Sequence, residues 1–251
     1  NSCSGTPVER AKDIVPRERK RLPNWFKTSL PIGKSQSVYN STMASVKDND
    51  LNTVCVEARC PNIHDCWGRG TATFMIAGDV CTRGCRFCAV NTAKTPPPLN
   101  PDEPEDLATA IESMGINHAV ITVVNRDDLP DGGANHYREC IMAVHDRCPD
   151  VGIELLCSDL DGNLESLKTL LNGLPIRVFA HNVECVPRLD KIVRDRRASF
   201  SQSLEILSEA KNLRPDLKTK TSIMVGIGET DSEVIEAMEM IRSSEVDMIT
   251  L

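Results

Sequence analysis

The stretch Cys81-Thr82-Arg83-Gly84-Cys85-Arg86-Phe87-Cys88 decides the fold, because it places three cysteines at C-x3-C-x2-C spacing within one short loop. It follows an apolar run at residues 72–78 that has the composition of a buried strand. A second trio, Cys55, Cys60 and Cys66, lies upstream at C-x4-C-x5-C spacing. Two compact trios in one chain predict two separate iron–sulfur sites with different roles.

Composition narrows the classes of function. The chain has 251 residues, of which 40% are hydrophobic and 26% are charged, as in ordinary globular domains. No apolar run approaches the ~20 residues of a membrane span. The net charge of −7 argues against a general nucleic-acid binder, although a local basic patch could still take an acidic protein partner.

Cysteine usage argues against a disulfide framework, since eleven cysteines is an odd count and no secretory signal is present. Five cysteines stand outside the two trios. We expect these five to be small, mostly buried apolar residues: Cys3, Cys140, Cys148, Cys157 and Cys185.

Strand and helix patterns alternate from residue 71 onward. Strands are predicted at residues 72–78, 118–124, 151–157, 176–180, 221–227 and 246–251. Helices are predicted at residues 103–114, 164–172, 200–213 and 231–243, with a weaker pattern at 135–147. This alternation is typical of βα units around a parallel sheet. Because no G-x-G-x-x-G follows the first strand, a partial (β/α)6 barrel is favoured over a dinucleotide-binding open sheet.

The first 70 residues read as an extension of the barrel. Residues 1–50 are polar and weakly periodic, which predicts an irregular arm with Trp25 and Phe26 as anchors. Residues 51–70 contain breakers and are predicted to be a loop. The expected division is therefore an N-terminal extension at 1–70 with the second cysteine trio, and a barrel at 71–251.

Polar side chains follow the predicted strands, where chemistry sits in a (β/α) barrel. They are the cysteines of the first loop, Asn125 to Asp128, Ser158 and Asp159, His181, Asn182 and Glu184, and Gly228 and Glu229. Three thiolates cannot fill a four-iron cluster, so one iron stays open to an external ligand. A catalytic zinc with three protein ligands and a water is the sharpest rival, and a purely structural set of packed thiols is the other.

The resemblance to a known family rests on a series of motifs. They are Ala58 to Asn62, Gly70 to Ile76, Cys81 to Cys88, Arg126 to Ala134, His181 to Glu184 and Met224 to Thr230. From about Leu22 to its end the chain resembles the lipoyl synthase family of the radical S-adenosylmethionine (SAM) superfamily. This resemblance implies a partial (β/α)6 TIM-like barrel of the radical SAM type, with an N-terminal extension that carries a second cluster.

The resemblance also implies cofactors and roles. Cys81, Cys85 and Cys88 would hold a catalytic 4Fe-4S cluster whose open iron chelates SAM. Cys55, Cys60 and Cys66 would hold an auxiliary 4Fe-4S cluster that donates sulfur. The substrate would be an octanoyl group on a lysine of a carrier domain, with sulfur inserted at carbons 6 and 8. Cleaving such unactivated C–H bonds needs a radical, and no nucleophile–base pair is visible in the sequence.

Softer assignments concern residues that would contact cofactor or substrate. The backbone near Phe87 would meet the adenine, and the segment from Ser222 to Glu229 resembles the family's adenine-side strand. The full set of expected cofactor-binding residues is Phe87, Arg126, Asp128, His181, Asn182, Glu184, Gly226 and Glu229. Alternative roles stay open: a plain core strand for residues 222–229, and a charged turn for Arg126, Asp127 and Asp128.

The chain departs from the family pattern in several places. Asn125 stands where aspartate is usual, Cys157-Ser158 where an apolar residue and proline are usual, Cys185 where threonine is usual, and Ser222 where glycine is usual. The family closes its auxiliary cluster with a serine in a later segment that this sequence does not contain. We therefore expect a fragment or truncated product that lacks this fourth ligand.

The expected partners follow from the resemblance. They are an octanoylated carrier, either a dehydrogenase acyltransferase domain or the glycine-cleavage H protein, and a ferredoxin or flavodoxin as electron donor. Neither nucleic acid nor membrane is expected. The bacterial cytoplasm is the expected location, with the matrix of an organelle as the alternative. Other functions left open are a biotin-synthase-like enzyme, against which the C-x4-C-x5-C trio of Cys55, Cys60 and Cys66 speaks, and a non-catalytic iron–sulfur or zinc protein.

Overall fold

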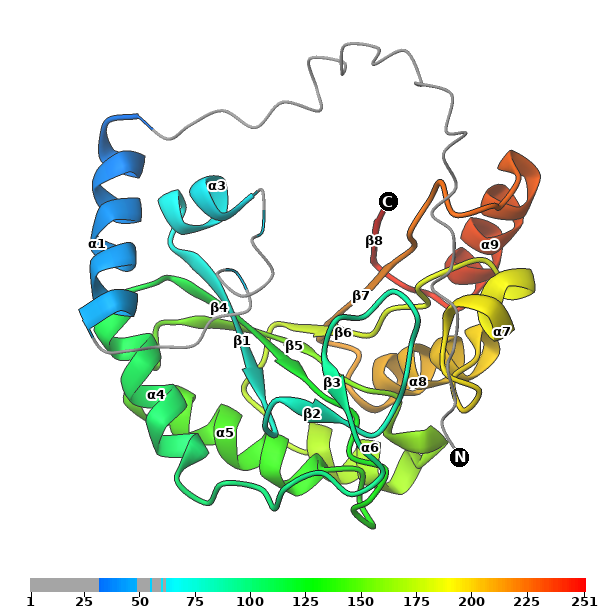
Figure 1. Ribbon diagram of the computed structural model, residues 1–251, viewed down its shortest axis with the longest axis horizontal. Coiled ribbons are helices and arrows are strands. Elements are labelled where there is room, and N and C mark those ends of the chain that lie inside the picture. Colours follow the sequence, from blue (N-terminus) through cyan, green and yellow to red (C-terminus); the bar gives the residue numbers. More distant parts are fainter. Residues whose placement is uncertain (1–31, 49–54, 56–59, 61) are drawn as a thin grey trace, which may run out of the picture.

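The computed structural model describes residues 32–48, 55, 60 and 62–251. Its central feature is a curved sheet of six strands whose spatial order follows the chain (Figure 1). The strands are β1 (Thr71–Ile76), β4 (His118–Val123), β5 (Gly152–Leu156), β6 (Val178–Ala180), β7 (Lys218–Ser222) and β8 (Met248–Thr250). Every neighbouring pair is parallel. The predicted α/β class and partial (β/α)6 barrel are confirmed.

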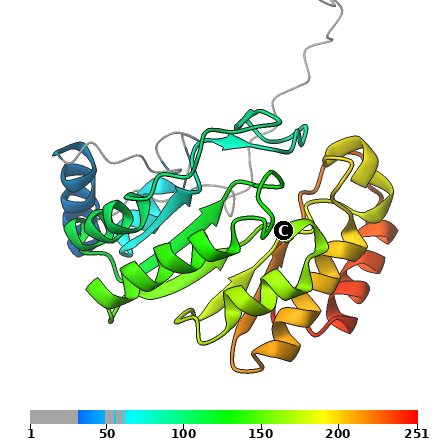
Figure 2. The same ribbon diagram turned by 90° about the horizontal axis from the view of Figure 1, so that it is seen from below.

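Helices cover the outer side of the sheet, as Figures 1 and 2 show. They are α4 (Glu103–Met114), α5 (Ala134–Arg147), α6 (Leu164–Leu171), α8 (Phe200–Leu213) and α9 (Asp231–Ser243). Their ends follow capping rules: α4 stops at Gly115 with φ of 59°, and α9 begins with a capping box of Thr230 and Glu233. All five lie where the sequence predicts helices, including the weaker pattern at 135–147.

The core lies between this helical layer and the sheet. Side chains alternate along β1, so Ala72, Phe74 and Ile76 are buried. They pack in one apolar cluster with residues of the covering helices such as Ile111 and Ile141. The faces of a parallel sheet are buried, so polar groups that bind ligands lie at the ends of its strands. In a (β/α) barrel they lie at the carboxyl ends.

The predicted strand at residues 221–227 is wrong. The strand is β7, Lys218–Ser222, and it is built from alternating lysine and threonine, with Thr219 and Thr221 fully buried. The apolar residues that suggested a later strand, Val225 and Ile227, are exposed in a turn. Gly226 and Gly228 adopt φ of 90° and 120° there, which a continuing strand does not allow.

The N-terminal predictions also need correction. Residues 34–48 form helix α1 (Lys34–Asp48) rather than an irregular arm, and helix α3 (Ile63–Gly68) lies within the predicted loop. The reason in α3 is tertiary packing, because Trp67 is completely buried in the core cluster beside β1. The anchors Trp25 and Phe26 lie outside the described residues.

Several short elements were not predicted from the sequence. Strands β2 (Val80–Cys81) and β3 (Asn91–Thr92) pair in parallel and frame the loop that carries the three cysteines. Helix α7 (Asp190–Val193) follows a single 3-10 turn, η3 (Pro187–Leu189), between β6 and α8. Among the described residues, no helix is both long and apolar enough to cross a membrane.

Candidate active site at the carboxyl ends of the strands

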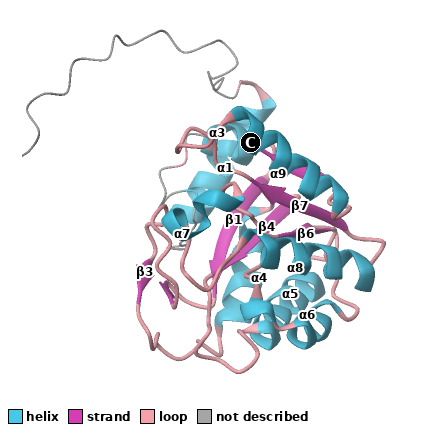
Figure 3. Cartoon of the chain, turned by 90° about the vertical axis from the view of Figure 1, so that its right-hand side faces the viewer, coloured by secondary structure: helices cyan, strands magenta, loops and turns pink. Residues whose placement is uncertain are grey.

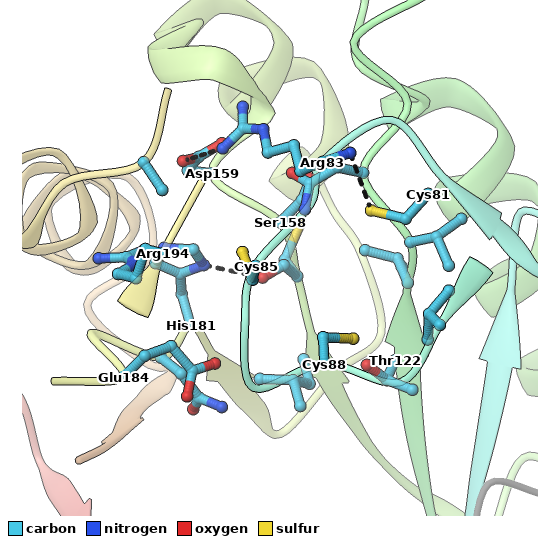
Figure 4. Close-up of a pocket in the computed structure, with 18 of the residues that line it drawn as sticks. Cys81, Arg83, Cys85, Cys88, Thr122, Ser158, Asp159, His181, Glu184 and Arg194 are labelled. Atoms are coloured by element: carbon cyan, nitrogen blue, oxygen red, sulfur yellow. Dashed lines mark hydrogen bonds and ion pairs between the residues drawn. The ribbon is translucent and has the colours of Figure 1, made fainter. Parts of the chain in front are cut away.

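A cavity of about 270 Å³ opens at the carboxyl ends of the strands (Figure 4). Met75 of β1, Thr122 of β4 and Leu156 of β5 supply its floor, and the loop between β2 and β3 closes one side. Seven of the residues predicted to bind metal or cofactor line it: Cys81, Cys85, Phe87, Cys88, His181, Asn182 and Glu184. The fold thus brings together, around one cavity, residues that lie more than 100 positions apart in the sequence.

The three cysteines of the loop fit an iron–sulfur cluster better than a single metal ion. Their thiols are free, and backbone N–H groups of Arg83 and Asp195 donate to Cys81 Sγ at 3.4 Å and Cys85 Sγ at 3.3 Å. N–H donors to sulfur stabilise thiolates and tune the potential of clusters. Burial raises the pKa of the Cys85 thiol, and the Asp195 N–H opposes that rise.

Spacing speaks against zinc at either trio. Four thiolates around zinc at bonds of about 2.3 Å sit roughly 4 Å apart. Among the residues that the structure describes, the one group of three ligand atoms within 4.8 Å of one another is Glu103, His136 and Cys140. Neither cysteine trio has its three sulfur atoms within that distance of one another, so neither forms a closed tetrahedral zinc site.

Arg83 anchors the cysteine loop to the barrel. Its side chain is 2% exposed and pairs with Asp127 at 2.8 Å, Asp159 at 2.6 Å and Asp161 at 3.3 Å. Although burial alone would lower it, the hydrogen bonds that Arg83 donates to Asp127 and Asp159 raise the pKa of Arg83 above its usual value. The loop is therefore tied to the ends of β4 and β5 by a buried charge that cannot leave its partners without a large cost.

A second set of contacts ties the loop to the segment after β6. Arg86 N donates to Val193 O at 2.9 Å, and Gly84 N donates to Asp195 Oδ2 at 3.0 Å. The hydrogen bond from Arg197 holds the pKa of Asp195 well below its usual range. The cysteine loop is thus fixed from both sides, by strand ends on one and by the α7 segment on the other.

His181 lines the cavity, and both of its ring nitrogens form hydrogen bonds. Its Nδ1 lies 2.8 Å from Cys157 O, and its Nε2 lies 2.9 Å from Ser203 Oγ. A carbonyl oxygen only accepts, so Nδ1 carries the proton, and the hydroxyl of Ser203, which Arg194 also contacts at 2.8 Å, donates to Nε2. Burial lowers the pKa of His181, which keeps the ring neutral.

Glu184 carries backbone strain into the cavity. Its φ of 66° is rare for a residue with a side chain, and it forms an isolated bridge with Ile223 between the ends of β6 and β7. Burial raises the pKa of its carboxyl, and Asn182 opposes this by a hydrogen bond. A strained, partly desolvated carboxyl that faces a cavity is a typical feature of a binding site.

Four of the predicted cofactor-binding residues do not line the cavity. Arg126 is buried and pairs in a bidentate way with Asp128, and its Nη1 donates to Ala77 O. This pair is the charged turn that the sequence left open as an alternative. Gly226 and Glu229 form an exposed turn, in which the Glu229 carboxylate accepts from Gly226 N and Ile227 N.

The second trio comes together beside α3. Cys60 N donates to Cys55 O at 3.1 Å, and Cys66 lies in α3 itself. The pKa of the Cys66 thiol is raised first by burial and then by the neighbouring thiols of Cys55 and Cys60. Mutual repulsion between thiolates at one place is what a bound cationic group relieves, so this donor set also fits an iron–sulfur cluster.

The close group of Glu103, His136 and Cys140 serves the fold rather than a metal. Glu103 accepts from Ala77 N at 2.9 Å and Gly78 N at 3.3 Å, and it lies 2.5 Å from His136 Nε2. Burial raises the pKa of Cys140 strongly, so its thiol stays protonated. The carboxylate thus holds the turn after β1 through two backbone N–H groups and His136.

Of the remaining cysteines, Cys140, Cys157 and Cys185 are buried and Cys148 is partly so, as predicted, whereas Cys3 lies outside the described residues. Sequence reasoning missed Arg83 and Arg194, which line the cavity, and the role of Cys157 in its wall. A signal for Arg83 existed: an arginine between two cysteines of a tight loop, with acidic residues after two neighbouring strands.

Comparison with known proteins identifies the family to which this chain belongs. A family model described as the radical SAM superfamily matches residues 75–241, and one described as the N-terminal domain of lipoyl synthase matches residues 7–60. The chain is 49% identical over 239 residues to mitochondrial lipoyl synthase of Xenopus laevis and 49% identical over 240 residues to that of Bos taurus. In each case 93% of this chain and 63% of the relative are covered.

Solved structures agree in fold. Methylornithine synthase superposes with a TM-score of 0.55 at 14% identity, covering 87% of this chain and 60% of that one. The FeFe-hydrogenase maturase HydG from Carboxydothermus hydrogenoformans superposes with a TM-score of 0.56 at 13% identity, covering 84% and 58%. At such identities the likeness concerns the fold alone.

Proposed function

Because the chain belongs to the radical S-adenosylmethionine superfamily, we propose that it is a lipoyl synthase, which inserts two sulfur atoms at carbons 6 and 8 of a protein-bound octanoyl group. The chain spans about 63% of the length of the curated relatives it matches, and the activity of those relatives is therefore stated here as a proposal. The observation that carries the proposal is the presence of two cysteine trios, one in the wall of a barrel cavity and one beside α3.

Cys81, Cys85 and Cys88 would hold a 4Fe-4S cluster with SAM on its open iron, and Cys55, Cys60 and Cys66 would hold a second, sulfur-donating cluster. When bound, the first cluster and SAM supply a 5′-deoxyadenosyl radical strong enough to take hydrogen from an unactivated carbon. The hard chemistry belongs to the cofactors, and the protein supplies position and isolation.

The chain's own residues would do this by binding and by excluding water. Arg83, Asp127 and Asp159 fix the cysteine loop over the strand ends through buried ion pairs. Glu184 offers a carboxylate to a cationic group in the cavity, such as the ammonium of SAM, and Phe87 offers an apolar surface at its rim. His181, neutral and locked by Ser203, adds an uncharged wall that does not compete for protons.

The apolar part of the cavity wall would suit an acyl chain. Met75, Val123 and Leu156 line it together with Val90 and the thiol of Cys157. Burial raises the pKa of Cys157 strongly, so this thiol remains neutral and behaves as an apolar group. A wall of this kind can take a saturated chain without leaving buried polar groups unpaired.

The proposal also covers the division of the chain, the partners and the location. We place the cluster-bearing extension at residues 1–70 and the barrel at 71–251. The acyl carrier would be an acyltransferase-type lipoyl domain or a glycine-cleavage H protein, with a ferredoxin or flavodoxin as electron donor. The similar proteins of frog, cow and fruit fly are mitochondrial, which favours an organelle matrix over the bacterial cytoplasm expected from the sequence.

The decisive experiment supplies the anaerobically reconstituted protein with SAM, a strong reductant and an octanoyl-lysine peptide. We expect 5′-deoxyadenosine, a peptide heavier by two sulfurs, and about eight irons per chain. Replacing Cys88 by serine should abolish 5′-deoxyadenosine. The matched variant Cys140→Ser, at a buried cysteine outside both trios, should retain it.

Two results would contradict the proposal at different levels. If 5′-deoxyadenosine forms while no sulfur enters the peptide, the chemistry stands only at the level of the superfamily. Stoichiometric zinc without acid-labile sulfide would instead favour a non-catalytic metal protein.

A further inference from the structure

One charged surface of the molecule has no use in the chemistry described above. It is the outer face of α7 and of the cysteine loop beside it, with four exposed residues: Arg86, Lys191, Ile192 and Arg196. We call this surface the basic ridge. Figure 3 shows α7 and β3 on the same side of the molecule, with the loop between them.

The ridge is one continuous surface because its two parts are joined by backbone contacts. Arg86 N donates to Val193 O at 2.9 Å, which brings the cysteine loop against the end of α7. Asp195 N donates to Cys85 Sγ at 3.3 Å one turn further on. The chain at Cys85 and Arg86 therefore lies against residues 193–195, although more than 100 positions separate the two segments in sequence.

The charge of the ridge opposes that of the whole chain. Residues 188–197 contain five cationic side chains and two carboxylates in a protein of net charge −7, and two of these cations, Arg188 and Arg197, also pair with carboxylates from outside the segment, Glu233 and Asp127. Both carboxylates are used internally: Asp190 pairs with Arg194 and accepts from Phe200 N, and Asp195 pairs with Arg197. Within the described part of the chain, Arg86, Lys191 and Arg196 form no ion pair.

The ridge lies next to the mouth of the cavity. Arg194 and Ala198 of the same segment line the cavity from inside, as do Cys85 and Phe87 of the loop. Phe87 is 42% exposed and Ile192 is 53% exposed, so apolar side chains stand among the cations. Exposed apolar groups rimmed by unpaired charge are typical of protein-binding surfaces.

We propose that the basic ridge binds an acidic surface of the protein that presents the acyl-lysine to the cavity. This rests on the proposed function, in which the substrate is attached to a folded carrier. A lysine tethered to a protein can reach the cavity only if the carrier lies against its rim. Arg86, Lys191 and Arg196 then steer and orient a carrier with carboxylates beside its modified lysine, and Ile192 packs against it.

The test compares a folded octanoylated carrier with a free octanoyl-lysine peptide as substrates of the reconstituted protein. The variant Lys191→Glu/Arg196→Glu reverses two ridge charges and leaves the cavity residues in place. We expect KM for the carrier to rise about tenfold at low salt, because two attractive exposed charge pairs become repulsive. Turnover of the peptide and formation of 5′-deoxyadenosine should be unchanged, and added salt should shrink the difference.

The matched control is Lys168→Glu/Arg177→Glu, which makes the same change of charge at exposed positions on α6 and before β6. It should leave KM for the carrier within about twofold of the wild type, because a surface substitution away from the contact has little effect. A water-soluble carbodiimide, which joins amines to carboxylates in contact, should link Lys191 to the carrier.

The outcomes separate the two proposals. A ridge variant that binds and modifies the carrier as the wild type does, together with no carbodiimide link at Lys191 of the wild-type protein, overturns the docking proposal alone. So does a ridge variant that loses peptide turnover to the same extent as carrier turnover, since the ridge would then act on the site itself. A wild-type protein that does not modify even the peptide overturns the proposed function, and the docking proposal with it.

Discussion

The two cysteine trios are held in the fold by different forces. The loop of Cys81, Cys85 and Cys88 is fixed by charge: Arg83 is buried between Asp127 and Asp159, and Asp195 receives the backbone of Gly84. The trio of Cys55, Cys60 and Cys66 is fixed by apolar packing. Its helix α3 is anchored by Trp67, which is fully buried, and the ring of Tyr39 in α1 lies 6.0 Å away.

This difference has a functional sense. Ion pairs and hydrogen bonds are directional, so they can hold the barrel loop in one geometry around the reacting groups. Apolar packing holds α3 against the barrel but fixes directions less strictly, which would suit the sulfur-donating cluster that we propose for this trio. Variants that remove one kind of force should therefore affect one trio and spare the other.

The largest effect should come from Arg83→Met. This substitution keeps most of the side-chain volume but leaves Asp159 buried without its cation, and it leaves Asp127 with only Arg197 as a cationic partner. We expect a loss of about 3 to 5 kcal/mol in the free energy of unfolding, the usual cost of breaking a buried ion pair. The barrel trio should lose its iron while the trio beside α3 keeps its share.

Iron and sulfide per chain, together with urea unfolding, measure this effect. The control is Arg188→Met, because Arg188 forms an exposed pair with Glu233 and should cost less than about 1 kcal/mol. If Arg83→Met strips iron equally from both trios, the two sites are not held independently and the comparison fails.

Trp67→Leu should act on the other trio. The indole is completely buried, and replacing it by a smaller side chain leaves a partly filled space, at a cost of about 2 kcal/mol. We expect selective loss of iron from the trio of Cys55, Cys60 and Cys66, visible as half the iron content with 5′-deoxyadenosine formation retained. Sulfur insertion should cease.

Trp67→Phe sharpens this prediction. The indole Nε1 has no hydrogen-bond partner among the described residues, so phenylalanine removes a buried unpaired donor along with some volume. We therefore expect it to cost clearly less than leucine. A loss of 5′-deoxyadenosine in either variant would show that α3 also supports the barrel loop.

The barrel could be predicted from the sequence because its strands and helices carry local signals. Helix α8 begins and ends where its apolar spacing predicts, and the cysteine loop stands after β1 as its motif indicates. The predicted bounds of strand β7 are wrong because its buried side chains, Thr219 and Thr221, are threonines. They alternate with exposed or half-buried residues as a strand requires, but they give no pattern of apolar residues in the sequence.

The contacts of the site were less visible. The pairing of Arg83 with Asp159 joins residues 76 positions apart, and only the sheet order brings them together. Arg126 and Asp128 show the converse, since they carry a motif of the family yet pair with each other outside the cavity wall. Helix α3 is stabilised by the burial of Trp67 against the barrel, and its six residues alone are too short a segment to predict a helix.

The third prediction concerns the pH dependence of stability and His181, which lines the cavity beside the barrel trio. Burial lowers the pKa of His181 below the value of about 6.5 that it has in the unfolded chain. As pH falls below about 6.5, the unfolded chain binds a proton that the folded protein refuses, so stability is complete above this pH and declines below it. We expect the decline to be about 1 kcal/mol between pH 7 and pH 5.5.

His181→Gln should flatten this dependence, because glutamine does not titrate. Urea unfolding at several pH values gives the slope, with His64→Gln as the control for removal of a histidine, since the ring of His64 lies against Tyr39 on the apolar side. An unchanged slope in His181→Gln would mean that another group carries the acid sensitivity.

The smallest effect tests the strain at the cavity. Glu184 has φ of 66°, and Ala77, Leu160 and Asp161 also have positive φ after β1 and β5, whereas the described residues before β1 with positive φ are the glycines Gly33 and Gly70. Residues with side chains in the left-handed region thus lie near the barrel trio, which is held by charge.

At Glu184 we expect the glycine variant to be more stable than the alanine variant by about 0.5 to 1 kcal/mol, because only alanine is destabilised by the left-handed backbone. The same pair of substitutions at Glu236, exposed within α9, should give the opposite sign, with alanine favoured by about 1 kcal/mol. Both Glu184 variants lose the carboxyl equally, so their difference in urea unfolding isolates the backbone, and equal stabilities would show that the site is not strained.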